Sequence, residues 1–503
     1  MSIGLRELCY CSAKLTPSNC SGKRLYLSLG ISFLDWSCEK MSRILIHGGN
    51  VVIQEGVYPL DILINEGRIV GLYEPGEAPH TDETIDASQT MVLPGAIDGH
   101  SHFFQQDPQA DIFDEAAFEG FTNGGRGAAA GGITTVVEMP QAIPPTTNGA
   151  ALLRKRDLAA ADAIVDFSLW GGAISGQPLQ AIRDQIEAGA VGFKAFMCND
   201  DPDFPALNDF ELKALLENLK DASIMLSLHA ENDALVQGNR EKLQASGRVD
   251  PLAYIESRPP MVEAEAVNRV IFFAERTGGW AHITHMSSPD AAELVRKAKQ
   301  RGVRLTAETC PHYLAMDVEY ITRLGPYAKC APPLRTKEEV EKLWGYLMDG
   351  TIDCITSDHA SWSKASKDAG LDNIWKAPNG MPGIQTMLPV MVTEARRRSC
   401  SWTQIVQWTA ITPAKIWHLA PKKGSIRVGG DADLVLIDPE WEWVLHNEDL
   451  LHYEHWTPLA GQTFCGRIIR TLVRGETVFL DEAQEKITVR PGFGQYIPPQ
   501  TAH

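Results

Sequence analysis

The middle of the chain alternates short apolar runs with longer amphipathic runs. Apolar runs of strand length lie at 96–100, 133–138, 165–170, 191–196, 224–229, 281–285, 303–308 and 353–357. Between most of them, apolar residues recur at helical spacing, as at 179–188, 209–219, 263–275, 289–299 and 337–348. Repeated strand–helix units with eight strands predict an α/β fold, a (β/α)8 TIM barrel, over residues 96–420.

The two flanks of this region have a different pattern. Residues 41–95 and 421–490 carry short β-type runs punctuated by glycines. We expect these flanks to pair into one small β-sandwich domain, followed by a C-terminal tail at 491–503. Residues 1–40 are expected to be a dispensable, disordered extension or an upstream translation, because Met41 begins a segment that reads like the start of a protein. Loss of activity on removal of residues 1–40 would contradict this expectation.

Composition narrows the class of protein. The chain has 503 residues, 44% hydrophobic and 22% charged, as is typical of a globular enzyme. Its formal net charge of −18 argues against nucleic-acid or anionic-membrane partners, which would be repelled. The apolar stretch 25–36 is too short to span a bilayer and no cleavage site follows it. The 10 cysteines form neither a disulfide framework nor a CxxC pair, which fits a reducing, cytoplasmic location.

Candidate metal ligands lie where the predicted strands end. His100 and His102 share one face of the first strand, so both imidazoles can bind one divalent cation such as Zn²⁺. Alone, this pair could equally be polar residues at a strand exit. However, barrel enzymes place their chemistry at the C-terminal ends of strands. Four further strand ends carry residues that are, or can become, metal ligands, namely Lys194, His229, His285 and Asp358.

Lys194 is the unusual member of this set, because an ammonium group repels cations. Burial within the apolar segment 192–196 would disfavour its charged form. The neutral amine can add CO₂ to give a carbamate, N6-carboxylysine, whose two oxygens can bridge two metals. With four histidines and one aspartate, this is enough for a binuclear site with an open position for water.

Several longer motifs extend the pattern. They are DGHSH (98–102), GGITTVVEMP (131–140), GFKAF (192–196), HAEN (229–232), HMSS (285–288), ETCPHYL (308–314), APPLR (331–335) and SDH (357–359). Over residues 43–480 the chain resembles the cyclic amidohydrolases of the hydantoinase, allantoinase and dihydropyrimidinase group, within the amidohydrolase superfamily.

The resemblance implies a complete metal site and a quaternary structure. It implies a carbamylated Lys194 bridging two divalent ions, zinc by preference or else manganese or cobalt. His100, His102 and Asp358 would bind one ion, and His229 and His285 the other. It also implies a small-molecule cyclic amide substrate and a homotetramer or homodimer.

Other residues near the site receive lesser roles. The resemblance places ring-holding backbone groups near Thr309 and near Asn379 and Gly380, where glycine allows close backbone approach. Without the resemblance, Pro378-Asn379-Gly380 could be a plain surface turn. We expect His312 to pack behind the ligands and His359 to be only a neighbour of Asp358. His282 lies on the opposite strand face and is expected to be structural.

The expected reaction is hydrolysis of a cyclic amide. Two metals would supply hydroxide at neutral pH and polarise the ring carbonyl. Asp358 would accept a proton as general base and return it to the departing ring nitrogen as general acid. The product would be an N-carbamoyl acid, which places the enzyme in purine or pyrimidine catabolism.

The ring itself is only partly specified. A dihydroorotase is disfavoured because Phe103 and Phe104 follow the histidine pair, where dihydroorotases have an arginine. A dihydropyrimidinase is disfavoured because residues 197–199 lack the tyrosine of that group. Segments 165–172 and 375–380 resemble an L-selective or broad-range hydantoinase. We therefore expect a hydantoinase, then an allantoinase, then a dihydropyrimidinase. A non-catalytic assembly protein is disfavoured because all six ligand positions are filled.

Overall fold

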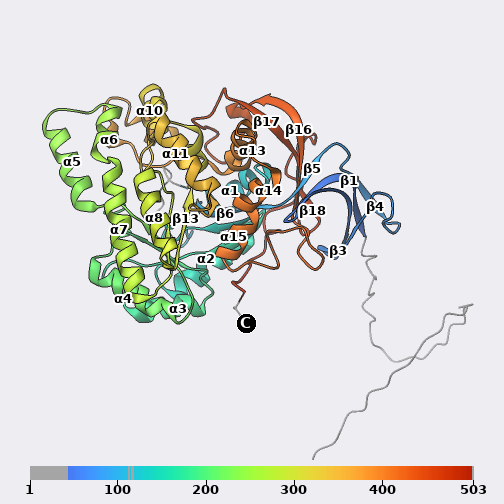
Figure 1. Ribbon diagram of the computed structural model, residues 1–503, viewed down its shortest axis with the longest axis horizontal. Coiled ribbons are helices and arrows are strands. Elements are labelled where there is room, and N and C mark those ends of the chain that lie inside the picture. Colours follow the sequence, from blue (N-terminus) through green and yellow to red (C-terminus); the bar gives the residue numbers. More distant parts are fainter. Residues whose placement is uncertain (1–42, 111–113, 115–117, 501–503) are drawn as a thin grey trace, which may run out of the picture. The chain divides into compact units, whose positions relative to one another are not determined.

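The computed structural model describes residues 43–110, 114 and 118–500 (Figure 1). The expectation for residues 1–40 lies outside these ranges. Within them, no helix is both long enough and apolar enough to cross a bilayer.

Ten parallel strand segments build the centre. They are β6 (Ala96–His102), β7 (Ile133–Glu138), β8 (Asp166–Leu169), β9 (Gly171–Gly172), β10 (Phe193–Phe196), β11 (Leu226–His229), β12 (Ala281–Ile283), β13 (Leu305–Thr309), β14 (Cys354–Ile355) and β15 (His359–Ala360). They form two parallel sheets, β15-β6-β7-β8 and β14-β13-β12-β11-β10-β9. Because β9 directly continues β8, and β15 follows β14 after three residues, the strand order returns to its start. This is the connectivity of a (β/α)8 barrel.

Helices connect these strands. They are α1 (Gly120–Ala130), α2 (Gly149–Asp162), α3 (Leu179–Glu187), α4 (Asp209–Lys220), α5 (Asp233–Ala245), α6 (Pro251–Ser257), α7 (Pro260–Thr277), α8 (Pro289–Gln300), α9 (Pro311–Ala315), α10 (Val318–Leu324), α11 (Lys337–Met348), α12 (Lys364–Asp368), α13 (Met387–Arg397), α14 (Trp402–Val406) and α15 (Thr412–Ile416). Helix α11 has the predicted bounds, because Thr336 and Glu339 form a capping box at its start. Helix α7 begins three residues before its predicted start, at Pro260, a residue suited to the first helical turn.

The flanks form one eight-stranded sheet. Its strands are β1 (Ile44–Ile53), β2 (Gly56–Asn65), β3 (Arg68–Tyr73), β4 (Glu83–Asp86), β5 (Met91–Pro94), β16 (Leu434–Val444), β17 (Thr463–Val473) and β18 (Glu476–Leu480). The order is β18-β17-β16-β5-β1-β2-β3, with β4 beside β1, so antiparallel pairing of β5 with β16 joins the two flanks. Figure 1 shows the blue N-terminal strands beside the orange C-terminal strands. Ile62, Val92, Leu434 and Leu472 share one buried cluster inside this sheet.

Part of the predicted tail belongs to the barrel. The amide of Phe167 in β8 donates to the carbonyl of Gln495 at 2.9 Å, and the amide of Ile497 donates to the carbonyl of Phe167 at 2.7 Å. Ile497 is buried. Residues 495–497 therefore extend the edge of β8.

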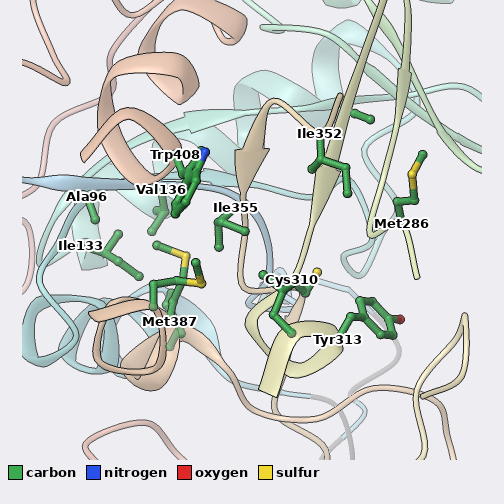
Figure 2. Close-up of a cluster of buried hydrophobic side chains, with 14 of the residues drawn as sticks. Ala96, Ile133, Val136, Met286, Cys310, Tyr313, Ile352, Ile355, Met387 and Trp408 are labelled. Carbon is green, nitrogen blue, oxygen red and sulfur yellow. The ribbon is translucent and has the colours of Figure 1, made fainter. Parts of the chain in front are cut away.

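An apolar cluster lies between β14 and β7, the strand that pairs with the first barrel strand β6. Figure 2 shows Ile133 and Val136 of β7 near Ile355 of β14, with Met387 of α13 and Trp408 packed against them. Fully burying one such side chain stabilises the fold by about 1.5–3 kcal/mol. This packing holds β6 and β14 where their polar ends can meet.

Candidate active site

A cavity of about 560 Å³ contains all six predicted metal ligands. His100 and His102 come from β6, Lys194 from β10 and His229 from β11. His285 and Asp358 lie two and three residues beyond the ends of β12 and β14. The predicted convergence at the strand ends is therefore present, although β12 and β14 end before the residues they position.

Asp358 faces the histidine pair of β6. Its Oδ1 lies 3.2 Å from Nε2 of His100 and 3.5 Å from Nε2 of His102. Burial by itself would raise the pKa of Asp358, but the neighbouring histidines lower it to about 2. Burial lowers the pKa of His102 to about 4. At neutral pH this group therefore offers a carboxylate and a neutral imidazole, the forms that bind metals.

Glu308 orients His100 from behind. Its Oε1 lies 2.5 Å from Nδ1 of His100, and its Oε2 lies 3.1 Å from Nε2 of His282. Burial would raise the pKa of Glu308, but the two histidines hold it far below its ordinary value. An ionised Glu308 accepts the proton on Nδ1 of His100, so the lone pair on Nε2 faces the cavity. His282, expected to be structural, supports this carboxylate.

The second histidine pair is oriented in the same way. Nε2 of His229 lies 2.8 Å from Oε2 of Glu231, a carboxylate that also pairs with the buried Arg258. Nδ1 of His229 lies 3.0 Å from Nε2 of His285. Burial, reinforced by Lys194, lowers the pKa of His285 well below its usual value, so this ring is neutral. Two facing imidazole nitrogens at this distance suit a shared cation.

Lys194 is buried as predicted. Its Nζ donates to Oγ1 of Thr284 at 3.1 Å and lies 5.2 Å from the ring centroid of Phe196. Burial lowers its pKa to about 8, opposed by the charges of Asp358 and Glu308. A substantial fraction of neutral amine is therefore available at neutral pH.

The donor atoms fit a divalent metal. The ligand atoms of His100, His102 and Asp358 lie within 4.8 Å of one another. Nε2 of His100 has no hydrogen-bond partner among the described residues, although it is buried. A second acidic group nearby, Asp200 with Glu231, is already paired with Arg258, and Asp200 also lies 3.7 Å from Arg240.

The residues expected to contact substrate divide into two kinds. Asn379 and Gly380 line the cavity. Thr309 does not line it, and its buried hydroxyl donates to the carbonyl of Met286 at 2.7 Å. The role expected for a backbone group near Thr309 stays a prediction.

Two further histidines lie beside the site. His312 is buried within metal-ligand distance of Asp358, and its Nε2 is unpartnered in the described part of the chain. Nδ1 of His359 accepts the amide of Gly383 at 3.1 Å, and its ring does not line the cavity.

Sequence reasoning gave no role to several residues around the site. Glu231 and Glu308 lie within quoted motifs at strand ends, so their position carried a usable signal. Arg258 carried no such signal, because its partners Asp200 and Glu231 lie beside it only in the folded chain. The ring of Phe104 stacks on that of His102, with their centroids 5.4 Å apart. The backbone of Phe104 has a positive φ of 45°. Such a backbone conformation is rare outside glycine and is often found at functional sites.

Comparison with known proteins identifies the family. The Amidohydrolase family model matches residues 91–478. An L-hydantoinase of Paenarthrobacter aurescens is 33% identical over 459 residues, covering 91% of this chain and 98% of the relative. An allantoinase of Rubrobacter xylanophilus is 38% identical over 439 residues, covering 86% and 94%. The solved L-hydantoinase (dihydropyrimidinase) of Arthrobacter aurescens has a TM-score of 0.86 at 33% identity, covering 91% of this chain and all of that one. The chain therefore belongs to the amidohydrolase family.

Proposed function

We propose that this chain is a cyclic amidohydrolase that opens hydantoin-type rings to N-carbamoyl acids. The observation that carries this proposal is the convergence of His100, His102 and Asp358 with His229 and His285 in one cavity, with Lys194 in its wall. Relatives named hydantoinase and allantoinase, found by sequence and by structure, support the same reaction class.

The cofactors of this proposal are two divalent ions, zinc by preference, and CO₂ for Lys194. His100, His102 and Asp358 would hold one ion, and His229 and His285 the other, with N6-carboxylysine at Lys194 shared between them. When bound, such a pair lowers the pKa of water and polarises the ring carbonyl.

The chain's own residues handle the proton. Asp358 is ionised at neutral pH and lines the cavity. We propose that it accepts a proton from the attacking water and returns it to the ring nitrogen as the carbon–nitrogen bond breaks. The oxygen of that water ends in the new carboxylate, and the nitrogen leaves as part of the N-carbamoyl group.

The walls of the cavity favour a 5-substituted hydantoin. Phe104, Phe196, Phe204 and Trp362 line it and can accommodate an apolar substituent. This aromatic lining supports a hydantoinase.

Allantoinase is the second candidate. Allantoin is itself a hydantoin with a polar ureido substituent, and Asn199, Arg240 and Lys329 also line the cavity. The identity of 38% to an allantoinase supports this alternative.

A turnover panel tests the proposal. The zinc-loaded protein is assayed with both enantiomers of 5-benzylhydantoin, with allantoin and with dihydrouracil, and metal content is measured in the same preparation. We expect about two metal ions per chain and the highest kcat/KM with a 5-benzylhydantoin. A higher kcat/KM with allantoin would select the second candidate. Two bound metals without turnover of any of these rings would contradict the proposed function.

The homotetramer or homodimer implied by the resemblance stays a prediction. Light scattering coupled to size-exclusion chromatography measures the mass of the assembly directly.

A further inference from the structure

Every carbonyl of the segment 377–380 accepts a hydrogen bond from a buried or half-buried side chain. Nζ of Lys329 donates to the carbonyl of Ala377. Nζ of Lys367 donates to the carbonyl of Pro378 at 3.0 Å and to that of Gly380 at 2.5 Å. Nε1 of Trp362 donates to the carbonyl of Asn379 at 2.7 Å. The segment has no strand or helix to fix it, so these side chains determine its path.

Lys367 is a buried cation without a carboxylate partner in the described part of the chain. Its side chain is fully buried in α12, and the carbonyl of Lys329 lies 3.4 Å from its Nζ as a third acceptor. A neutral amine has two N–H donors, whereas an ammonium group has three. Burial and the nearby Lys329 lower the pKa of Lys367, and its two close contacts can be made by either protonation state. This one buried amine thus binds two carbonyls of the segment 377–380.

Lys329 holds the same segment from the cavity side. Its Nζ lies 4.8 Å from the ring centroid of Tyr254, and its side chain is buried in the cavity wall. Its own carbonyl accepts the amide of Gly380 at 3.0 Å. Lys329 therefore contacts both ends of the segment.

The segment presents Asn379 to the cavity. Asn379 and Gly380 both line it, and Oδ1 of Asn379 is buried without a hydrogen-bond partner among the described residues. Gly380 has a φ of 112°, and a Cβ there would lie 2.7 Å from Cβ of Ala360. Glycine is required by this path. The fixed path of the segment therefore determines where Asn379 lies in the cavity wall.

We propose that Lys367 and Lys329 are positioning residues that hold the segment 377–380 in the conformation that presents Asn379 to the substrate ring. This inference rests on the proposed function for the identity of the ligand. The two lysines act through the loop and do not themselves react.

The test compares two replacements of Lys367 with a matched control. Lys367→Met removes all three donors, whereas Lys367→Gln keeps an amide with two. Lys376→Met replaces an exposed lysine that directly precedes the segment. Each variant is assayed with the ring that the wild-type protein turns over best, alongside metal content, thermal unfolding and hydrogen exchange of the peptide containing Gly380.

We expect Lys367→Met to raise KM about tenfold or more, because the segment 377–380 would no longer hold Asn379 against the substrate ring. A tenfold loss of affinity corresponds to about 1.4 kcal/mol of lost contacts. Its kcat should change less than about threefold, its metal content should be unchanged, and exchange at Gly380 should become faster. Lys367→Gln should recover part of the KM, and Lys376→Met should match the wild type. If Lys367→Met does not fold, Lys329→Met is judged by hydrogen exchange at Gly380 alone, because Lys329 also lines the cavity and its loss can change KM directly.

Two results would overturn the inference. One is an unchanged KM together with unchanged exchange at Gly380 in the folded variant. The other is a loss of kcat in parallel with metal content, which would mean that the lysine supports the metal ligands instead. Failure of the proposed function is a separate outcome, seen as a wild-type protein that turns over none of the rings. In that case the exchange measurement alone decides whether Lys367 holds the loop.

Discussion

The carboxylate of Glu308 lies 2.5 Å from Nδ1 of His100, the ring nitrogen opposite the one that faces Asp358. The two residues are 208 positions apart in the chain. Their contact fixes which nitrogen of His100 carries the proton, and so which one is free to bind a metal.

Replacing Glu308 with glutamine should weaken the metal site. The amide cannot provide the same charged acceptor for Nδ1, and loss of such outer partners typically lowers metal affinity about 10- to 100-fold. Competition with a chromophoric chelator measures this affinity. Glu338→Gln, at an exposed glutamate in the first turn of α11, is the control and should leave the affinity unchanged. Equal affinity in Glu308→Gln and the wild type would show that His100 needs no such support.

Lys194→Ala should lose both turnover and much of its metal. A short carboxylic acid such as propionate, added with zinc, should restore part of the activity by standing in for the carbamate. Lys194→Arg should stay inactive, because a guanidinium group cannot bridge two cations. Normal activity and metal content in Lys194→Arg would contradict a carbamate at this position.

Activation of the metal-free protein should depend on pH. Carbamate formation needs the neutral amine of Lys194, whose pKa is about 8 because of burial. The neutral fraction rises about tenfold per pH unit below that value and levels off above it. At a fixed partial pressure of CO₂, the rate at which CO₂ and zinc together restore activity should therefore rise from pH 6.5 to 8 and then flatten. A rate independent of pH in this range would argue against an amine as the reacting group.

Asp358→Asn should keep part of its metal but lose turnover by several orders of magnitude. The amide retains an oxygen for the metal, whereas it cannot carry the proton, and general acid–base catalysis alone contributes about 10²–10⁴-fold. His359→Asn serves as the comparison, because His359 does not line the cavity. Measurements of kcat, metal content and thermal unfolding are made on both. Equal losses of turnover in two folded variants would mean that the proton path also involves His359.

Arg258→Met should destabilise the fold strongly. It leaves Glu231 buried without its cation and Asp200 with only Arg240, 3.7 Å away, and breaking a buried ion pair costs about 3–5 kcal/mol. Arg301→Met removes an exposed pair with Glu275 and should cost less than about 1 kcal/mol. Chemical denaturation of the two variants measures the difference in the free energy of unfolding. Similar small losses in both would show that Glu231 does not depend on Arg258.

The sequence by itself predicted the barrel strands, several of the helices and the residues that we propose to react. Short apolar runs and helical periodicity are local properties, so the strand positions and the bounds of α11 follow from neighbouring residues. His100, His102 and Lys194 could be chosen because each lies at the end of such a run. Burial of Lys194 followed from its apolar neighbours for the same reason.

Only the tertiary structure decided which groups support those residues. The contact of Glu308 with His100 joins segments that are distant in the chain. The contact of Lys367 with the segment 377–380 joins segments connected by irregular turns. Thr309 ends β13, yet its hydroxyl donates to the carbonyl of Met286 and does not reach the cavity. A residue's type and local pattern limit what it can bind, whereas its actual partner depends on how the packed elements bring side chains together. Hydrogen-bond partners in a buried site are therefore fixed by packing, and local sequence does not encode them.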